Sequence, residues 1–173
     1  MKKWGILFLL LAGVNFAYLQ ELTKIKRVSL DSIKNIDVIA FGSCNHQGLT
    51  QEMWLNMLEF NPDIFIFLGD AVYGDCKTTD CIVKTFNKQL KKPYFLDFLE
   101  KTPMIGIWDD HDYGPNNCGT ENPIKKESQK YFLDFIGEPL NSTRRIQEGI
   151  YTSYTFGSEG EKVKFILLDE RYF

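Results

Sequence analysis

The sequence lacks an excess of positive charge. Its 173 residues include 20 Lys and Arg against 23 Asp and Glu, which gives a formal net charge of -3 at pH 7. Proteins that bind nucleic acid present a basic patch or stripe to the phosphate backbone. The densest basic groups here are typical of a solvated helix face and a loop: Lys88, Lys91 and Lys92, then Arg144 and Arg145. We therefore expect no nucleic acid partner.

The sequence also has no apolar run long enough to span a membrane. Residues 1–17, MKKWGILFLLLAGVNFA, place two lysines before eleven apolar residues, whereas a spanning helix needs about 20. This layout is typical of a secretory signal peptide cleaved after Ala17, and it predicts a secreted or extracytoplasmic protein. Asn15 is a poor residue three positions before that cut, so an uncleaved N-terminal anchor is the alternative. A buried first helix is less favoured because nothing polar patterns the segment.

Internal repeats, low-complexity segments and linkers are absent as well. Apolar residues make up 44% of the chain and aromatic residues 14%, which is a globular composition rather than a disordered one. At this length the chain can bury the core of one domain. We expect a lead-in over residues 18–35 and one domain over residues 36–173.

Cysteine is present at four positions, Cys44, Cys76, Cys81 and Cys118. If the chain is exported, these residues meet an oxidising environment in which disulfides form. Four cysteines allow three pairings, and the sequence does not choose among them.

Apolar runs and helical periods alternate along residues 36–173. Continuous apolar runs bounded by turn residues predict buried strands, and spaced apolar residues predict helices, one capped by Thr50 and one broken at Pro93. The polar turn 157–161 between the last two strands predicts a hairpin. The order β-α-β-α-β-α-β-β indicates a layered α/β domain with a mainly parallel sheet. We expect strands at 36–41 and within 62–70, 103–110, 149–157 and 162–173, and helices within 50–60, 79–100 and 122–137.

A polar cluster follows each of four expected strands: GSCNHQ, GDAVYGD, DDHDYGPNN and DERYF. The carboxyl ends of parallel strands meet at one edge of a sheet, where open α/β folds bind ligands. Residues as far apart in sequence as Cys44, Asp70 and Asp109 should therefore converge there.

The converging side chains are ligand types for transition metals and hard cations. Gly69 lets the backbone turn so that the Asp70 carboxylate points into the site, where it can bridge two ions. Two ions about 4 Å apart can clamp a phosphoryl group and activate a water, and His111 could protonate the leaving oxygen. The candidates are Cys44, His46, Asp70, Tyr73, Asp75, Asp109, Asp110, His111, Asp112 and Asn116.

Each candidate also has a structural interpretation. Asp109 and Asp112 fit a capping role and a hydrogen bond that holds the imidazole, while Tyr73, His46 and Cys44 fit a core aromatic, a satisfied histidine and an inert buried thiol. The metal interpretation is favoured because ligand-capable residues follow three strand ends in one small domain. Without a cation, several carboxylates would need raised pKa values at once.

The motifs FGSCNHQ, FLGDAVYGD, WDDHDYGPNN and LDERYF resemble the successive motifs of the PhoD-like (alkaline phosphatase D) family of metallo-dependent phosphatases. The resemblance covers residues 36–173. It implies a four-layer α/β/β/α sandwich, of which this chain would be the N-terminal half. It also implies a multinuclear metal site that hydrolyses phosphate mono- or diesters, with an iron (Fe) centre held partly by cysteine and tyrosine and with calcium (Ca) nearby.

The resemblance implies a role for seven residues. His111 is similar to an imidazole that stabilises the transferring phosphoryl group, and Arg171 to an arginine suited to a bidentate phosphate contact. The residues similar to metal ligands are Cys44 (thiolate), Asp70 (bridging carboxylate), Tyr73 (phenolate), Asp110 (carboxylate) and Asn116 or its neighbour Asn117 (amide oxygen).

The chain departs from the family pattern in one respect. The family continues past the LDERYF strand to a Gly-Asp-x-His motif that supplies further ligands, whereas this sequence ends at Phe173. We therefore expect a C-terminally truncated domain, either a fragment of a longer product or a truncated protein with a damaged site, whose function by ancestry is hydrolysis of a phosphate ester substrate by a metal-activated water. The alternative is a non-catalytic secreted module that binds metal or phosphate. A glycosidase carboxylate pair involving Asp109 or Asp110 leaves Cys44 and Tyr73 unexplained.

Overall fold

A three-stranded parallel sheet organises the protein. The computed structural model describes residues 24–173, so the segment expected to be a signal peptide lies outside the described residues. The strands are arranged in the order β1-β2-β3, and Ile66 of β2 lies between Phe41 and Ile105 in register. The expectation of a mainly parallel sheet is confirmed. The three strands are β1 (Ile39–Gly42), β2 (Ile64–Leu68) and β3 (Met104–Ile107).

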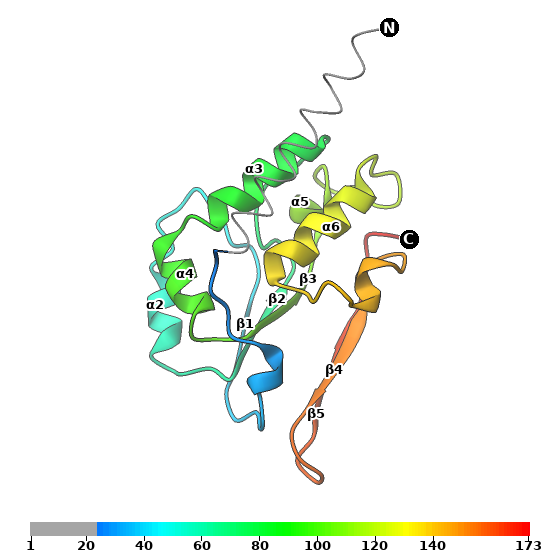
Figure 1. Cartoon of the computed structure of the whole chain (residues 1–173). Coiled ribbons are helices and arrows are strands. Elements are labelled where there is room, and N and C mark those ends of the chain that lie inside the picture. The colour runs from blue at the N-terminus through cyan, green and yellow to red at the C-terminus, as the bar shows by residue number, and fades with distance from the viewer. Residues whose placement is uncertain (1–23) are drawn as a thin grey trace, which may run out of the picture.

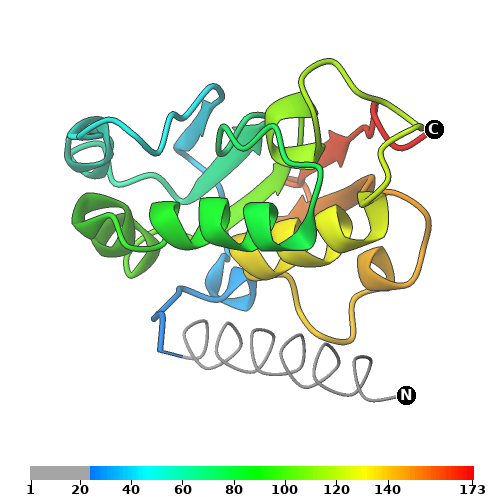
Figure 2. The ribbon, with the colours of Figure 1, turned by 90° about the horizontal axis from the view of Figure 1, so that it is seen from above.

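Helices cover one face of this sheet (Figures 1 and 2). The core there is aromatic: the fully buried Trp54 ring lies 5.1 Å from Phe65, 4.9 Å from Phe95 and 5.0 Å from Phe98, measured between ring centroids. Each such ring buries about 150–250 Å² and supplies much of the hydrophobic free energy of folding. The helices are α2 (Met53–Leu58), α3 (Thr79–Gln89), α4 (Pro93–Leu99), α5 (Asp110–Tyr113) and α6 (Lys125–Ile136). Within residues 24–173, none of them is long and apolar enough to cross a membrane.

Helix boundaries follow local chemistry with one exception. Pro93 separates α3 from α4 by occupying the first turn of α4, where its missing N–H costs nothing, and Gly137 ends α6 in the left-handed conformation at φ 79°. The expected cap at Thr50 is wrong. Helix α2 begins at Met53, and its N-cap residue Glu52 makes no side-chain cap hydrogen bond.

The first strand is less buried than expected. A continuous apolar run predicted a strand buried on both faces, but the residues of β1 alternate between exposed and half-buried, and Phe41 is 64% exposed. Both β1 and β3 are edge strands paired with β2, but the outer side of β3 is bordered by the buried Arg144 side chain, whereas no described segment pairs with the outer side of β1. The central strand β2 and the strand β3 are buried as expected.

The predicted hairpin is present as a separate two-stranded sheet of β4 (Thr152–Phe156) and β5 (Val163–Leu167). Arg144, in the 3-10 helix η2 (Thr143–Arg145), joins this hairpin to the rest of the domain. Its side chain is 1% exposed and pairs with Glu138 at 2.8 Å. Its guanidinium also donates to the carbonyls of Gly106 and Ile150, each at 2.9 Å, and to the hydroxyl of Tyr154 at 3.0 Å. At the outer edge of β3, the Gly106 carbonyl is thus hydrogen-bonded to the Arg144 side chain instead of to a further strand.

Replacing Arg144 with Met should lower the free energy of unfolding by about 3–5 kcal/mol, because the variant leaves the Glu138 carboxylate buried without its partner. Denaturant unfolding followed by circular dichroism measures the change. Lys164→Met, at an exposed position of β5, is the matched control and should change stability by less than about 0.5 kcal/mol. Equal midpoints for the two variants would contradict the assignment of Arg144 as a buried tie.

Candidate metal centre

The loops that follow β1 and β2 are joined by hydrogen bonds at the carboxyl edge of the sheet. The backbone N–H of Asn45 donates to Asp70 O at 2.8 Å, and its side-chain amide donates to Ala71 O at 2.9 Å. The Gln47 side chain pairs with both backbone groups of Tyr73, at 2.7 Å and 2.8 Å. The expected convergence of these two polar clusters is confirmed.

The side chain of Asp112 fastens the third cluster to the second. Its carboxylate is fully buried and accepts from the backbone N–H groups of Ala71 and Asp109, each at 2.8 Å. Burial raises the pKa of Asp112 well above its usual value, although these two hydrogen bonds act to lower it. Asp112 is therefore structural, and its partners are backbone amides rather than the imidazole of His111.

Three side chains meet in a group suited to a cation. One ligand atom from each of Asp70, Asp110 and His111 lies within 4.8 Å of the others. Burial raises the pKa of Asp70, as do the neighbouring carboxylates of Asp109 and Asp110, with His111 opposing them. The Oδ1 atom of Asp70 is buried and has no hydrogen-bond partner among residues 24–173. An acceptor in that position, beside a second carboxylate, fits a bound metal ion.

Asp110 stays an anion in the same group. Burial acts to raise its pKa, but the backbone N–H of Asn117 and the nearby His111 and Arg171 lower it overall. A carboxylate that remains ionised at neutral pH is a suitable metal ligand.

Cys44 and Tyr73 lie at the edge of this group. The Cys44 Sγ atom is exposed and lies 3.8 Å from Asp70 Oδ2. A hydrogen bond with Cys44 raises the pKa of the Tyr73 hydroxyl, and burial and the Asp70 carboxylate raise it further. The structure thus brings together five of the predicted residues, from the loops after β1 and β2 and from helix α5: Cys44, Asp70, Tyr73, Asp110 and His111.

Asp75 is the side-chain partner of His111. Its Oδ1 atom lies 2.7 Å from His111 Nδ1, and the backbone N–H groups of Gly74 and Asp75 donate to His111 O at 3.0 Å and 3.3 Å. The Tyr73 ring packs on the imidazole, with centroids 4.3 Å apart. Burial acts to lower the pKa of His111, but Asp75 and the carboxylates of Asp110 and Asp70 raise it overall. With Nδ1 engaged, Nε2 is the atom that remains for a ligand or substrate.

Arg171 reaches the group from the end of β5. Its Nε donates to Asp109 Oδ1 at 2.6 Å, and its Nη2 lies 3.8 Å from Asp110 Oδ1. The turn that carries Arg171 is built on Asp169, which accepts from the Trp108 indole at 2.8 Å and from the Arg171 backbone N–H at 3.0 Å. We assigned no role to Asp169 from the sequence alone. This residue follows the last strand, just as the other polar clusters follow the earlier strands.

Two other candidates lie outside the group. Asn116 is exposed, and its side chain makes no hydrogen bond with any residue of the described chain, whereas Asn117 contacts Asp110 through its backbone N–H. His46 stacks on Tyr73 with ring centroids 5.4 Å apart, and its Nδ1 accepts from Gly48 N at 3.0 Å. His46 therefore lies beside the site without joining the three ligand atoms.

Unusual backbone conformations are concentrated at this site. Cys44, Asp70, Asp75 and Asn117 adopt φ angles of 57°, 51°, 50° and 59°, in the left-handed region that disfavours side chains. Gly69, at φ 108°, lies so close to Asp109 that an added Cβ would be 2.6 Å from the Asp109 Cβ. Strained residues of this kind cluster at functional sites, where the surrounding structure holds them in place.

One cysteine pairing is present. Cys76 and Cys81 form a disulfide, while Cys44 and Cys118 are free thiols. Cys118 is buried, and burial together with the nearby Glu121 and Asp110 carboxylates raises its pKa to about 11.

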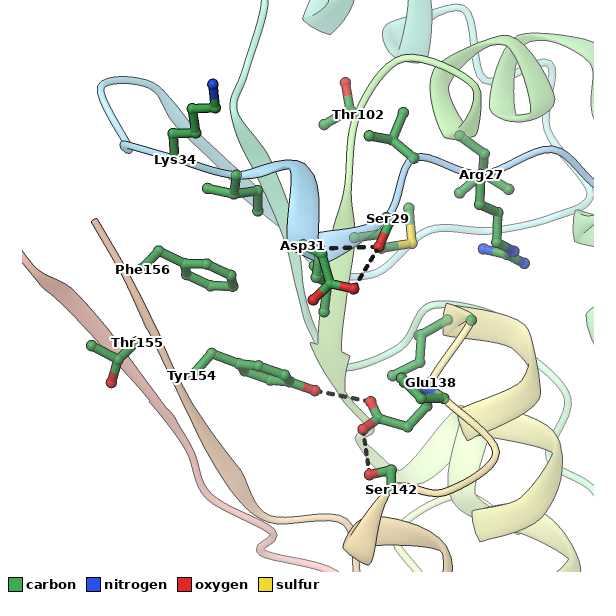
Figure 3. Close-up of a pocket in the computed structure, with 18 of the residues that line it drawn as sticks. Arg27, Ser29, Asp31, Lys34, Thr102, Glu138, Ser142, Tyr154, Thr155 and Phe156 are labelled. Carbon is green, nitrogen blue, oxygen red and sulfur yellow. Dashed lines mark hydrogen bonds between the residues drawn. The ribbon is translucent and has the colours of Figure 1, made fainter. Parts of the chain in front are cut away.

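One sizeable cavity does not coincide with this site. It has a volume of about 760 Å³ and lies between β4, the 3-10 helix η1 (Leu30–Ser32) and the amino end of β3 (Figure 3). Within it, Glu138 accepts from Tyr154 at 2.9 Å and from Ser142 at 2.6 Å (Figure 3). Because the residues with ligand chemistry lie at the opposite, carboxyl edge of the sheet, we place the candidate centre there.

Comparison with solved structures shows that the fold is similar to that of PhoD. The match to a solved structure of PhoD has a TM-score of 0.63 and 16% sequence identity, and it covers 78% of this chain. The chain spans 31% of the length of that PhoD chain. No family model and no curated protein matches the sequence. The expectation of a PhoD-like α/β fold is confirmed.

The two free thiols should differ in reactivity. At pH 7.5 a water-soluble disulfide reagent should modify Cys44 quickly, because its Sγ is exposed, and leave Cys118 unmodified until the protein is denatured. Absorbance of the released thiolate counts the modified groups. Cys44→Ser should remove the fast phase, and a fast phase that survives this substitution would contradict the assignment.

Proposed function

We propose that this chain carries the core of a metal-dependent phosphate ester hydrolase. The observation that supports the proposal most is the buried, unpartnered Oδ1 of Asp70, one of three side chains whose ligand atoms lie within 4.8 Å of one another. The PhoD-like fold agrees with it. Because the chain spans 31% of the matched PhoD chain, the activity of the whole enzyme is part of the proposal.

Four side chains form the proposed metal-binding set. Asp70 and Asp110 supply carboxylates, Cys44 a thiolate and Tyr73 a phenolate. Thiolate and phenolate donors suit iron, and carboxylate oxygens suit calcium, so we propose Fe and Ca as the metals. Asn116 stays a proposed ligand that would need its exposed loop to turn inward. When bound, the metal supplies Lewis-acid polarisation of a phosphoryl oxygen and activation of a water nucleophile.

His111 and Arg171 are the proposed catalytic groups. The imidazole is oriented by Asp75, which leaves Nε2 to donate a proton to the leaving oxygen of a phosphate ester. Arg171 is held beside Asp110 by its bond to Asp109, and its Nη1 has no hydrogen-bond partner in the described chain. A guanidinium in that position is suited to bind a non-bridging phosphate oxygen and to hold the substrate.

An extracytoplasmic location belongs to the same proposal. The N-terminal sequence and the disulfide between Cys76 and Cys81 support it, since structural disulfides persist in oxidising compartments. A non-catalytic module that binds metal or phosphate is the competing function, and the experiments below separate the two.

Asp70→Asn should remove metal binding and lower turnover of a chromogenic phosphodiester by more than about a hundredfold, since even partners of metal ligands contribute 10–100-fold. The same variant should stabilise the metal-free protein, because it removes a buried charge next to two other carboxylates. Metal analysis, turnover and thermal unfolding test the three effects, with the exposed Asp97→Asn as control. Retained metal with full turnover would exclude Asp70 from the site, and wild-type metal binding without turnover would support the competing function.

His111→Ala should lower turnover and leave the metal content unchanged, because the carboxylate, thiolate and phenolate donors remain. Metal analysis and turnover of the same samples measure both quantities. Loss of metal together with turnover would instead make His111 a ligand through Nε2.

A further inference from the structure

The loop between β2 and α3 carries Asp70 and, beyond it, two side chains that contact the His111 ring, and it leads into the disulfide. Tyr73 packs on the His111 ring, and Asp75 contacts its Nδ1 atom. The next residue, Cys76, is buried and is linked to Cys81 in the first turn of α3. The covalent link therefore lies one residue from the partner of the imidazole.

Asp75 needs such support because its own contacts are weak. Its side chain is 49% exposed, and an ion pair between partly exposed groups contributes little stability by itself. Its backbone adopts φ 50°, which a non-glycine residue avoids unless neighbouring structure imposes it. The 2.7 Å contact between Asp75 Oδ1 and His111 Nδ1 is thus maintained by the backbone of the loop rather than by the attraction between the two side chains.

The disulfide packs directly beneath this loop. Cys81 Sγ lies 3.7 Å from Gly74 O, and Cys76 Sγ lies 3.7 Å from Thr85 Oγ1 of α3. Gly74 fits so closely that an added Cβ would be 3.0 Å from Cys76 Sγ. Because Gly74 N also donates to His111 O, the disulfide, the loop backbone and His111 form one continuous set of contacts.

We propose that the Cys76–Cys81 disulfide positions Asp75, and through Asp75 the His111 imidazole, so that the centre is ordered in the oxidised chain and loosened in the reduced one. A covalent link removes conformations from the short segment it closes. Without it, the backbone N–H groups of residues 74–77 keep, within the described chain, only the bonds of Gly74 and Asp75 to His111 O, and the half-exposed Asp75 carboxylate exchanges its partner for water. The catalytic consequence rests on the proposed function, whereas the positioning does not.

Reduction of this bond balances as an ordinary thiol–disulfide exchange. A dithiol attacks one sulfur, the S–S bond breaks, and each protein sulfur ends as a protonated thiol while the dithiol closes into a cyclic disulfide. An extracellular or periplasmic dithiol system is the class of reaction partner that would use this bond as a control point.

Nitrogen NMR of the imidazoles tests the positioning in the metal-free full chain. Only two histidines, His46 and His111, contribute signals, and His111→Gln assigns them. In the double variant Cys76→Ser/Cys81→Ser, the nitrogen chemical shifts of the His111 ring should change by more than half of the difference to those of a freely exchanging imidazole. The shifts of His46 should stay unchanged. Asp75→Asn should produce the same movement with the disulfide intact, and the exposed Asp80→Asn should not. A dithiol-reduced wild-type sample repeats the comparison should the serine pair fold poorly.

An unchanged His111 spectrum in both the serine pair and the reduced chain would overturn the proposal, as would a movement that Asp75→Asn does not reproduce. In the metal-loaded protein the serine pair should lower kcat for a chromogenic phosphodiester by about tenfold, with metal content and KM unchanged. If the metal-loaded wild-type protein does not turn over the phosphodiester, the proposed function is wrong. The His111 spectrum would still show whether the disulfide positions the imidazole.

Discussion

The buried carboxylate of Asp112 fixes the geometry of the candidate centre, although we assign it no catalytic role. Asp112 accepts one backbone N–H from the loop after β2 and one from the start of α5. Asp70 directly precedes the first of these donors and Asp110 directly follows the second. The hydrogen bonds of Asp112 therefore fix the positions of Asp70 and Asp110, although these two carboxylates repel each other. A buried donor left unsatisfied costs about 1–3 kcal/mol, so the two loops cannot separate to relieve the repulsion without losing these bonds.

The same geometry explains why a cation and the fold should be coupled. Burial and neighbouring charge raise the pKa of Asp70, whereas Asp110 is kept ionised by Asn117 N, His111 and Arg171. One acceptor of the resulting site, Asp70 Oδ1, has no hydrogen-bond partner among the described residues. A ligand that binds only the folded state adds its binding free energy to stability. The hydrogen bonds between the loops preform the site, so the proposed metal would have less ordering of the chain to supply.

Much of this arrangement could be predicted from the sequence, because its signals are local. Continuous apolar runs located β2 and β3, Pro93 and Gly137 marked helix ends, and strand ends located Cys44, Asp70 and Asp110. Other features depend on contacts that no local pattern encodes. The exposure of Phe41 depends on which segments border each edge of the sheet, and the pairing of Cys76 with Cys81 on the packing of one loop on α3.

Other details depend on the fold in the same way. Asn116 stays a proposed amide ligand taken from the resemblance, and in the structure the turn after α5 presents the backbone N–H of Asn117 to Asp110 and leaves the Asn116 side chain exposed. Arg144 resembled a loop cation in sequence, yet its guanidinium ties β3 to the hairpin. Asp75 was visible as the second acid of GDAVYGD, although its pairing with His111 requires the fold.

The left-handed residues around the centre set a direction for selection. Glycine adopts such conformations without penalty, so Gly at position 44, 70, 75 or 117 would relax the backbone while deleting a thiol, a carboxylate or an amide. Selection for thermal stability alone would thus favour these glycine substitutions and remove the ligand-capable side chains from the candidate centre. Lineages that keep Cys44, Asp70 and Asp75 against that gradient would do so because chemistry at this edge is under selection.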